Sequence, residues 1–258
     1  MTPINRSSPK DWKDLQCQVK NILEECGLDA EVDKEIRTVR GNVKVDDYAV
    51  DSNSKPPIIY LCECKHWQSA VPKSAVRDFR TVVGDYGANW GFIISSAGFQ
   101  SGAFEAAAKT NVRLLTWDEF QELFVGRWIE NYMVPRLRKE VDALVEYTEP
   151  INSRIFRKAD QLDEPSRRRF LQLRKDYAEL AFLAAVFYGL ELFAPTELKP
   201  RALDLPMRRA LQGKRELSKT TIPGEILDAT CLRDFVDLIC KYAREGIAEF
   251  DQLFGGRA

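Results

Sequence analysis

The first part of the chain alternates between helical and extended patterns of hydrophobic residues. Apolar side chains in residues 11–26 recur at helical spacing, so this segment predicts an amphipathic helix. Residues 30–39 and 43–50 predict two strands that are joined by a short turn around Gly41. Residues 58–65 predict a third strand, because the start of this run is rich in β-branched and aromatic side chains.

Helices and single strands alternate in the next part of the chain. The pattern predicts a helix beginning at Pro72, a strand at 90–95, a helix at 103–109, a strand at 112–116 and a helix beginning at Asp118. The strand at 90–95 is mostly apolar, which is typical of a strand that is buried on both faces. Together these elements predict an α/β fold, in which helices flank a mixed β-sheet on both faces.

The strand patterns end near residue 130, and the rest of the chain is predicted to be mainly α-helical. Three helical segments follow, at residues 135–147, 156–193 and 226–254. Residues 195–224 contain several prolines and glycines and predict a loop-rich region. We therefore expect two domains, an α/β domain at residues 1–130 and a helical domain at residues 131–258.

The composition narrows the chemistry that the chain can perform. It has 258 residues, of which 45% are hydrophobic, with 38 Lys and Arg, 39 Asp and Glu, and a single histidine, His66. One histidine excludes sites that need several imidazoles, such as His-rich zinc centres and paired-His acid–base catalysis. Any catalysis must therefore depend mainly on carboxylates, lysine, hydroxyls or thiols.

Charge is divided unevenly along the chain. Residues 1–150 carry 19 Lys and Arg against 23 Asp and Glu, a net charge of −4, whereas residues 151–258 carry 19 against 16, a net charge of +3. Basic residues gather at 167–169 and within the loop-rich region 195–224. Neither half has the strong positive excess of a dedicated nucleic-acid-binding domain, so a solvated face is the default interpretation of these clusters.

Cysteines and apolar runs bear on the location of the protein. The six cysteines form no Cys-x-x-Cys pair, and a chain of this size can bury a core without disulfides, so we expect reduced thiols and a cytoplasmic protein. The N-terminal residues contain no apolar run of the kind that a signal peptide needs. The most apolar stretch, residues 180–190, has about half of the ~20 residues of a membrane span. We therefore expect a buried helix there and no membrane association.

The sequence Glu63-Cys64-Lys65 ends the third predicted strand. Side chains alternate across a strand, so Glu63 and Lys65 project to one face and Cys64 to the other. A carboxylate can hold a divalent metal ion, and a neighbouring ammonium group can orient water or stabilise developing negative charge. The tripeptide alone has little specificity, and a solvent-exposed ion pair worth roughly a few tenths of a kcal/mol is the competing interpretation.

The preceding strand supplies a second carboxylate. If the hairpin turns between Ser54 and Lys55, residue i faces residue 109−i, so Asp46 lies opposite Glu63 with about 5 Å between their Cβ atoms. Two carboxylates that close repel each other, and a bound Mg²⁺ relieves the repulsion because hard oxygen ligands suit it.

The register leaves Asp47 as an alternative partner. Shifting the turn by half a residue brings Asp47 opposite Glu63 in place of Asp46. Alternation along the strand does not decide between the two aspartates. The alternation of side chains predicts that Val45 lies on one face of the strand and that Asp46 and Tyr48 lie on the other.

Several separated blocks carry a resemblance to a known family. They are residues 44–49 (KVDDYA), 61–67 (LCECKHW), 75–83 (AVRDFRTVV), 91–102 (GFIISSAGFQSG) and 114–120 (LLTWDEF). In order and in type of element, this part of the chain resembles the Mrr-type restriction endonuclease family, within the PD-(D/E)xK nuclease superfamily, over roughly residues 10–125. The resemblance implies a restriction-endonuclease-like fold and a metal-dependent phosphodiesterase that acts on DNA.

The resemblance also implies roles for individual residues. Asp46 matches the metal-binding aspartate of the family, Glu63 its second carboxylate and Lys65 its catalytic lysine. Asp46 and Glu63 would hold the metal ion, which we expect to be Mg²⁺ with Mn²⁺ as a substitute. Such a mechanism requires no histidine, which suits a chain that has only one.

Three further positions follow from the resemblance. Many relatives carry a glutamate on the first helix, where this chain has Gln16; an amide can orient water or bind through its carbonyl, but it supplies no charge to a second metal ion. Gln100 and Ser101 match a polar pair at the edge of the active site, and we expect them to contact phosphate.

The sequence therefore favours a Mg²⁺-dependent DNA endonuclease followed by a helical domain, and the family suggests defence against foreign DNA. Cutting both strands with one site per chain favours a homodimer. Two alternatives stay open. One is a catalytically silent nuclease-fold protein that binds nucleic acid or a partner protein through its helical domain, and the other is a nuclease that acts on RNA or on single strands.

Overall fold

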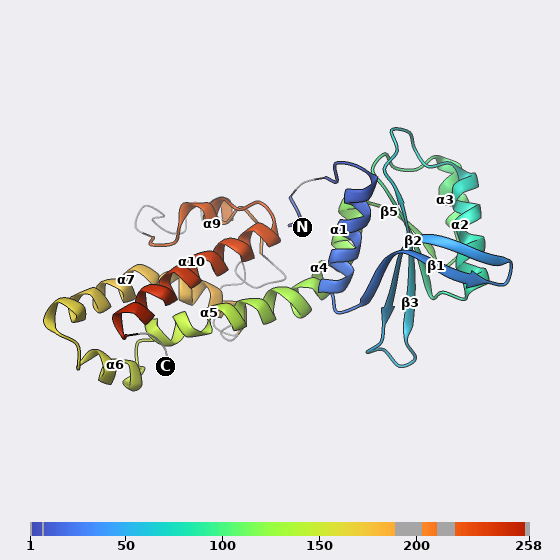
Figure 1. The fold of residues 1–258 in the computed structure, drawn as a ribbon. Coiled ribbons are helices and arrows are strands. Elements are labelled where there is room, and N and C mark those ends of the chain that lie inside the picture. Colours follow the sequence, from blue (N-terminus) through green and yellow to red (C-terminus); the bar gives the residue numbers. More distant parts are fainter. Residues whose placement is uncertain (1, 7, 189–202, 211–219, 256–258) are drawn as a thin grey trace. The chain divides into compact units, whose positions relative to one another are not determined.

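A computed structural model describes residues 2–6, 8–188, 203–210 and 220–255 (Figure 1). The chain divides into two compact units, one formed by residues 7–131 and the other by residues 132–258 together with Met1–Arg6. Most of the basic cluster expected in the loop-rich region lies outside the described residues, namely Lys199, Arg201, Lys214, Arg215 and Lys219.

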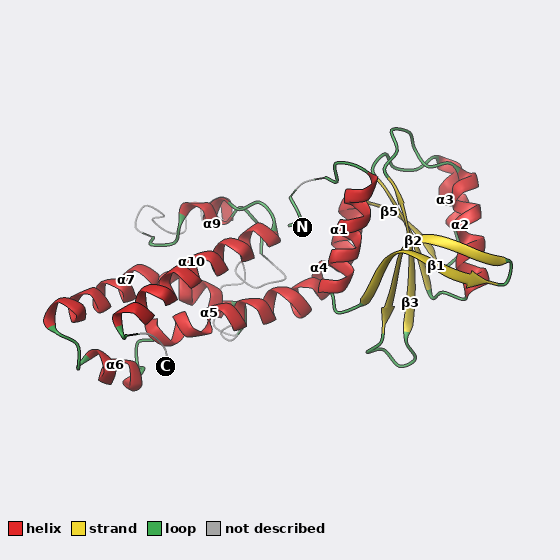
Figure 2. Ribbon diagram, in the orientation of Figure 1, coloured by secondary structure: helices red, strands yellow, loops and turns green. Residues whose placement is uncertain are grey.

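A five-stranded mixed sheet forms the centre of the first unit. Its strands stand in the order β1 (Asp29–Thr38), β2 (Gly41–Asp51), β3 (Ile58–Lys65), β4 (Trp90–Ser95) and β5 (Val112–Thr116) (Figure 2). β1, β2 and β3 pair antiparallel through hairpins, whereas β3, β4 and β5 pair parallel and are connected through helices. The predicted order of helices and strands in this part of the chain is confirmed.

Helices cover both faces of the sheet. α1 (Trp12–Glu25) and α4 (Trp117–Trp128) contact each other on one face, and α2 (Lys73–Tyr86) and α3 (Ser101–Ala107) contact each other on the opposite face (Figures 1 and 2). Strand β4 is buried between the two layers, which explains why its sequence is mostly apolar. The predicted fold class, a restriction-endonuclease-like mixed sheet flanked by helices, is confirmed.

Local sequence signals set the ends of these helices. The Asp11 side chain accepts a hydrogen bond from the backbone N–H of Asp14 at the start of α1. Thr116 and Glu119 form a capping box at the start of α4. Gly87 ends α2 in the left-handed conformation, with φ of 79°, which only glycine adopts without strain.

The β2–β3 hairpin has the predicted register. Asp47 pairs with Cys62 and Asp51 pairs with Ile58, so the numbers of paired residues add up to 109. Pairing between the two strands ends at Asp47. The next residue, Asp46, therefore lies where β2 and β3 part.

The alternation of side chains along β2 is broken at Asp46. The β1–β2 pairing also skips this residue, and Asp33, which would face it on β1, has a positive φ of 54°. Val45 and Tyr48 consequently pack against the same hydrophobic cluster, which includes the buried side of α2. The expectation that they lie on opposite faces was wrong, because the interrupted ladder shifts the two-residue alternation.

The second unit is helical. It contains α5 (Val134–Thr148), α6 (Ser153–Ala159), α7 (Glu164–Val186), α8 (Met207–Ala210), α9 (Gly224–Asp228) and α10 (Leu232–Leu253), and a π-helical turn, η1 (Ile129–Met133), leads into α5 (Figure 1). α5, α7 and α10 pack against one another, and aromatic side chains such as Tyr147, Phe170 and Phe250 fill the space between them. Among the described helices, none is long and apolar enough to cross a membrane.

Two of the predicted long helices are divided. The segment predicted as one helix at 156–193 contains a break between α6 and α7. Asp163 caps the start of α7 by accepting a hydrogen bond from Ser166 N–H at 2.9 Å. Pro165 has no N–H to donate, so it could not lie inside one continuous helix without removing a backbone hydrogen bond. The segment predicted at 226–254 is divided in the same way by Cys231, whose Sγ accepts from Asp234 N–H at 3.5 Å. Residues 189–193 lie outside the described residues.

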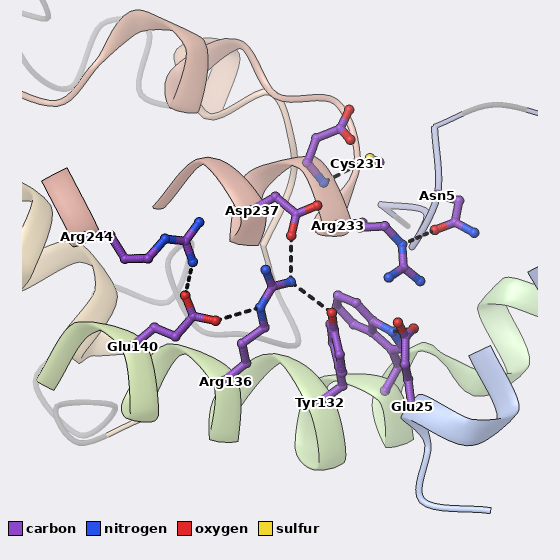
Figure 3. A network of polar contacts seen from close by, with 11 residues as sticks. Asn5, Glu25, Tyr132, Arg136, Glu140, Cys231, Arg233, Asp237 and Arg244 are labelled. Atoms are coloured by element: carbon purple, nitrogen blue, oxygen red, sulfur yellow. Dashed lines mark hydrogen bonds and ion pairs between the residues drawn. The ribbon is translucent and has the colours of Figure 1, made fainter. Parts of the chain in front are cut away.

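A polar network ties α5 to α10 (Figure 3). The Arg136 guanidinium donates to Asp237 at 2.6 Å and to the Tyr132 hydroxyl at 2.8 Å. Glu140 accepts from Arg136 at 3.2 Å and also pairs with Arg244 of α10. These contacts link the two helices through charge-assisted bonds as well as through their apolar faces.

The N-terminal residues belong to the helical unit. The backbone N–H groups of Leu232 and Arg233 donate to the carbonyls of Pro3 and Ile4, at 2.9 and 3.0 Å, at the start of α10. The Arg233 side chain also donates to Asn5 at 2.6 Å (Figure 3). That the two units fold as independent domains, with a boundary near residue 130, stays a prediction.

Candidate active site

Two carboxylates come together where β2 and β3 part. The Oδ2 atom of Asp46 accepts a hydrogen bond of 2.7 Å from the backbone N–H of Cys64. This bond fixes Asp46 beside the end of β3, on which Glu63 lies next to Cys64 in the chain. The negative charge of Glu63 acts on Asp46, as the pKa of Asp46 shows.

Lys65 forms an ion pair with Glu63 on the same strand. Its Nζ lies 2.5 Å from Oε1 of Glu63, and the two side chains are 19% and 24% exposed. Solvent and a ligand can therefore reach the pair, although most of its surface is covered. The lysine also lies 5.1 Å from the ring centre of Trp67, which is 42% exposed. This tryptophan ends the block 61–67 that carries the family resemblance.

Burial and, after it, the negative charge of Glu63 raise the pKa of Asp46 to about 6, although the Cys64 N–H and Lys65 oppose the shift. The carboxylate of Asp46 is therefore destabilised in the absence of an additional positive charge. A divalent cation between Asp46 and Glu63 would remove this penalty.

The donor set fits a hard divalent cation. Within the described residues, no group of three or more His, Cys, Asp and Glu side chains is arranged to hold a metal ion. Asp46 and Glu63 nevertheless offer two carboxylates, and Mg²⁺ in phosphate-processing sites is commonly held by one or two carboxylates together with water and phosphate oxygens.

Asp47 lies apart from this pair. It is fully buried, its Oδ2 accepts a weak hydrogen bond from Sγ of Cys64 at 3.4 Å, and its Oδ1 has no hydrogen-bond partner among the described residues. Burial raises the pKa of Asp47 to about 8. The structure thus groups Asp46, rather than Asp47, with Glu63 and Lys65.

Two polar side chains near the motif bind the backbone. Gln16 on α1 is buried, and its Nε2 donates to the backbone carbonyl of Asp46 at 2.6 Å. Its side chain therefore holds the main chain of β2 at the point where the ladder is interrupted. His66 Nε2 lies 3.1 Å from the carbonyl oxygen of Pro9, so the single imidazole also contacts the main chain.

Gln100 and Ser101 lie on the same edge of the sheet but outside the group of charged residues. The loop after β4 joins the end of β3 through Ser96, whose N–H donates to the Lys65 carbonyl at 3.1 Å. Gln100 N–H donates to the Val71 carbonyl at 3.1 Å, and Gln100 and Ser101 are both exposed at the start of α3. They are positioned to meet a ligand that extends along this edge.

Comparison with known proteins shows a similarity between the first unit and one protein family. Residues 9–124 match the family model Mrr_cat, described as a restriction endonuclease. A crystal structure of a protein of unknown function, AF1548, matches 67% of this chain and 96% of its own length, at 17% identity and a TM-score of 0.37. No curated protein matches the chain. With their Asp…Glu-Cys-Lys core on a mixed five-stranded sheet, residues 9–124 are similar to this restriction endonuclease family, in agreement with the resemblance found in the sequence.

Proposed function

We propose that the chain is a metal-dependent endonuclease that hydrolyses phosphodiester bonds in DNA. The observation that carries the proposal is the meeting of Asp46, Glu63 and Lys65 at the carboxyl end of β3. Ligands of open α/β sheets bind at such strand ends. Burial and the negative charge of Glu63 raise the pKa of Asp46, and a divalent cation would relieve both effects, so its binding is favourable there.

Asp46 and Glu63 would hold the cation, which we infer to be Mg²⁺, with Mn²⁺ as a substitute. When it is bound, such an ion lowers the pKa of a coordinated water and neutralises charge on the phosphate group. The Cys64 N–H keeps the Asp46 carboxylate in place, and Gln16 holds the backbone of the same residue. The site thus has a fixed aspartate on one strand and a more accessible glutamate on the next.

Lys65 supplies a positive charge beside the two carboxylates. An ammonium group has three donors, and the contact with Glu63 uses one of them, so the others are able to bind a phosphate oxygen or to orient the attacking water. Gln100 and Ser101 would contact phosphates that flank the cleaved bond. Each of these roles depends only on side chains that the sheet edge already brings together.

The experiment that tests the proposal is a cleavage assay with the full chain. Supercoiled plasmid and linear duplex are incubated with Mg²⁺, with Mn²⁺ or with EDTA, and the same reactions are run with Asp46→Ala, Glu63→Ala and Lys65→Ala. We expect cleavage that requires a divalent cation and that is lost in all three variants. Parallel reactions with single-stranded DNA and with RNA establish the substrate class.

Each other outcome has a defined meaning. Cleavage of RNA or of single strands alone, lost in the same variants, would support the alternative substrate class. Binding without any cleavage, unaffected by the three substitutions, would support a catalytically silent nuclease-fold protein. A cytoplasmic location, a homodimer and a role in defence against foreign DNA stay predictions from the sequence.

A further inference from the structure

Positive charge in the C-terminal half gathers in two segments, residues 151–175 and residues 195–224, and most of the second lies outside the described residues. Residues 151–175 carry eight Lys and Arg against three Asp and Glu, a net charge of +5. Residues 176–258 carry 11 against 13, a net charge of −2. Within the described residues, the positive excess therefore belongs to α6 and the first half of α7, which follow one another at one end of the helical unit (Figure 1).

Packing explains two of these eight cations. Arg174 donates to the backbone carbonyls of Tyr147 and Thr148, at 3.0 and 3.2 Å, and its guanidinium lies 4.5 Å from the ring centre of Phe156. It therefore caps the C-terminal end of α5. Arg169 pairs with Glu249 and joins α7 to α10. Both arginines have a structural role.

The remaining cations have no such role. Within the described part of the chain, the side chains of Arg154, Arg157, Lys158 and Lys175 make no ion pair or hydrogen bond, and all four are exposed. Two more arginines have exposed ion pairs only, Arg167 with Asp160 at 3.2 Å and Arg168 with Glu164 at 4.0 Å. Exposed pairs of this kind contribute little to stability and are easily exchanged for another anion.

Three of the free cations share one face of α6, which we call the α6 basic face: Arg154, Arg157 and Lys158. They occupy positions i, i+3 and i+4, which lie on the same side of a helix. The opposite side is anchored, because Ile155 and Ala159 are buried. The three cations are thus presented outward by a helix whose position is fixed.

Helix stability accounts for this placement only in part, because the helix dipole favours Arg157 and Lys158 in the last turn of α6 but opposes Arg154 in the first turn. Arg154 lies in the first turn of α6, and Arg167 and Arg168 follow the first residues of α7. Positive charge near a helix N-terminus is opposed by the helix dipole. Three exposed cations on one face of α6, which make no ion pair among the described residues, match an anionic ligand with several regularly spaced charges. The phosphate backbone of duplex DNA has such a charge pattern.

We propose that the α6 basic face, extended by Lys175 on α7, binds the phosphate backbone of duplex DNA. The helical unit would then hold the substrate without reading its sequence, because phosphate contacts position a protein but do not specify bases. This inference rests on the proposed function in one respect, since the ligand is the substrate proposed for the nuclease unit.

The test measures binding of the full chain to a fluorescent duplex in EDTA, so that cleavage plays no part. One variant combines Arg154→Gln, Arg157→Gln and Lys158→Gln. The matched control combines Lys139→Gln, Arg209→Gln and Lys241→Gln, which removes the same charge from exposed positions elsewhere in the helical unit. Binding is measured at several salt concentrations, and thermal unfolding verifies that both variants are folded. Lys175→Gln alone serves as a second, milder variant.

We expect the α6 variant to bind about tenfold or more weakly near 100 mM salt, with the slope of log K against log salt smaller by about 2.7, which corresponds to three phosphate contacts. The control should bind like the unmodified chain. Equal binding by the two triple variants, or tighter binding of single-stranded RNA than of duplex, would overturn the inference. Cleavage with Mg²⁺ is measured in parallel. If the unmodified chain cleaves DNA while the α6 variant binds normally, this inference fails and the proposed function stands.

Discussion

The backbone N–H of Cys64 donates a hydrogen bond of 2.7 Å to Oδ2 of Asp46, across the two strands that carry the candidate site. The acceptor is a side chain of β2, one residue beyond the last backbone pair between β2 and β3. One bond thus interrupts the ladder and places a carboxylate beside Glu63. It also separates the roles of two adjacent aspartates, because Asp47 points to the buried side, toward the thiol of Cys64.

Because the two aspartates have different roles, their conservative substitutions are predicted to affect cleavage to very different extents. Asp46→Asn removes a charged oxygen ligand, so we expect the single-turnover rate of cleavage to fall about 100-fold or more at a fixed Mg²⁺ concentration. Asp47→Asn should change the rate only a few-fold, because its buried carboxyl has a pKa of about 8 and is already neutral near pH 7. The reverse result would assign the metal site to Asp47.

The pKa of Asp46 predicts how cleavage depends on pH. A proton and a metal ion compete for this carboxylate, so its metal-binding form is depleted as the pH falls through about 6. At a subsaturating Mn²⁺ concentration, we expect the rate at pH 5 to be about tenfold below the rate at pH 7. More Mn²⁺ should shift the midpoint of the profile to lower pH. A rate that is constant from pH 5 to pH 8 would contradict this account.

Gln16 is predicted to support Asp46 through the hydrogen bond to its backbone carbonyl. Gln16→Met keeps a side chain of similar length but removes the N–H that donates to the Asp46 carbonyl. Methionine has no donor that could replace this hydrogen bond. We expect the free energy of unfolding to fall by about 1–3 kcal/mol and the cleavage rate to fall with it. Urea unfolding and single-turnover cleavage measure the two effects. If both are unchanged, the hydrogen bond does not position Asp46.

Much of the site follows from the sequence because it depends on local patterns. A turn between Ser54 and Lys55 gives the register in which paired residues add up to 109, and the structure has that register, although alternation along β2 left a register that pairs Asp47 with Glu63 open. The separation of Glu63 and Lys65 from Cys64 follows from the alternation of side chains in a short, continuous strand. These features require no knowledge of distant parts of the chain.

Other features depend on contacts that no local pattern contains. The break of alternation at Asp46 arises because a side chain accepts a donor of the next strand, and the position of Gln16 depends on a contact with a residue 30 positions away. The division of the predicted helix at 156–193 is a different case. Asp163 and Pro165 signal a helix start, but the apolar periodicity on both sides of them conceals it.

Asp47 is predicted to make stability depend on pH. Its pKa is about 8 in the folded chain and near 3.8 in the unfolded chain. Between these pH values the folded state binds more protons than the unfolded state, so the free energy of unfolding falls as the pH rises from 4 to 8. Asp47→Asn removes this titration, and we expect the variant to be more stable than the unmodified chain by ~1 kcal/mol or more at pH 8. Urea unfolding at several pH values measures the difference. If Asp47→Asn and the unmodified chain have the same free energy of unfolding at pH 5 and again at pH 8, Asp47 is not held as a buried, protonated carboxyl.

Two glycines allow a test of whether the two units are independent domains. A Cβ on Gly91 would lie 2.6 Å from Cγ2 of Val83 within the first unit, and a Cβ on Gly246 would lie 2.8 Å from Cε1 of Tyr177 within the helical unit. Gly91→Ala and Gly246→Ala should therefore each cost about 1–3 kcal/mol through overpacking. In scanning calorimetry we expect two unfolding transitions. Each substitution should lower the midpoint temperature of the transition of its own unit and leave the other midpoint unchanged. A single transition that both substitutions shift equally would mean that the units unfold together, because a defect confined to one core would then destabilise the whole chain.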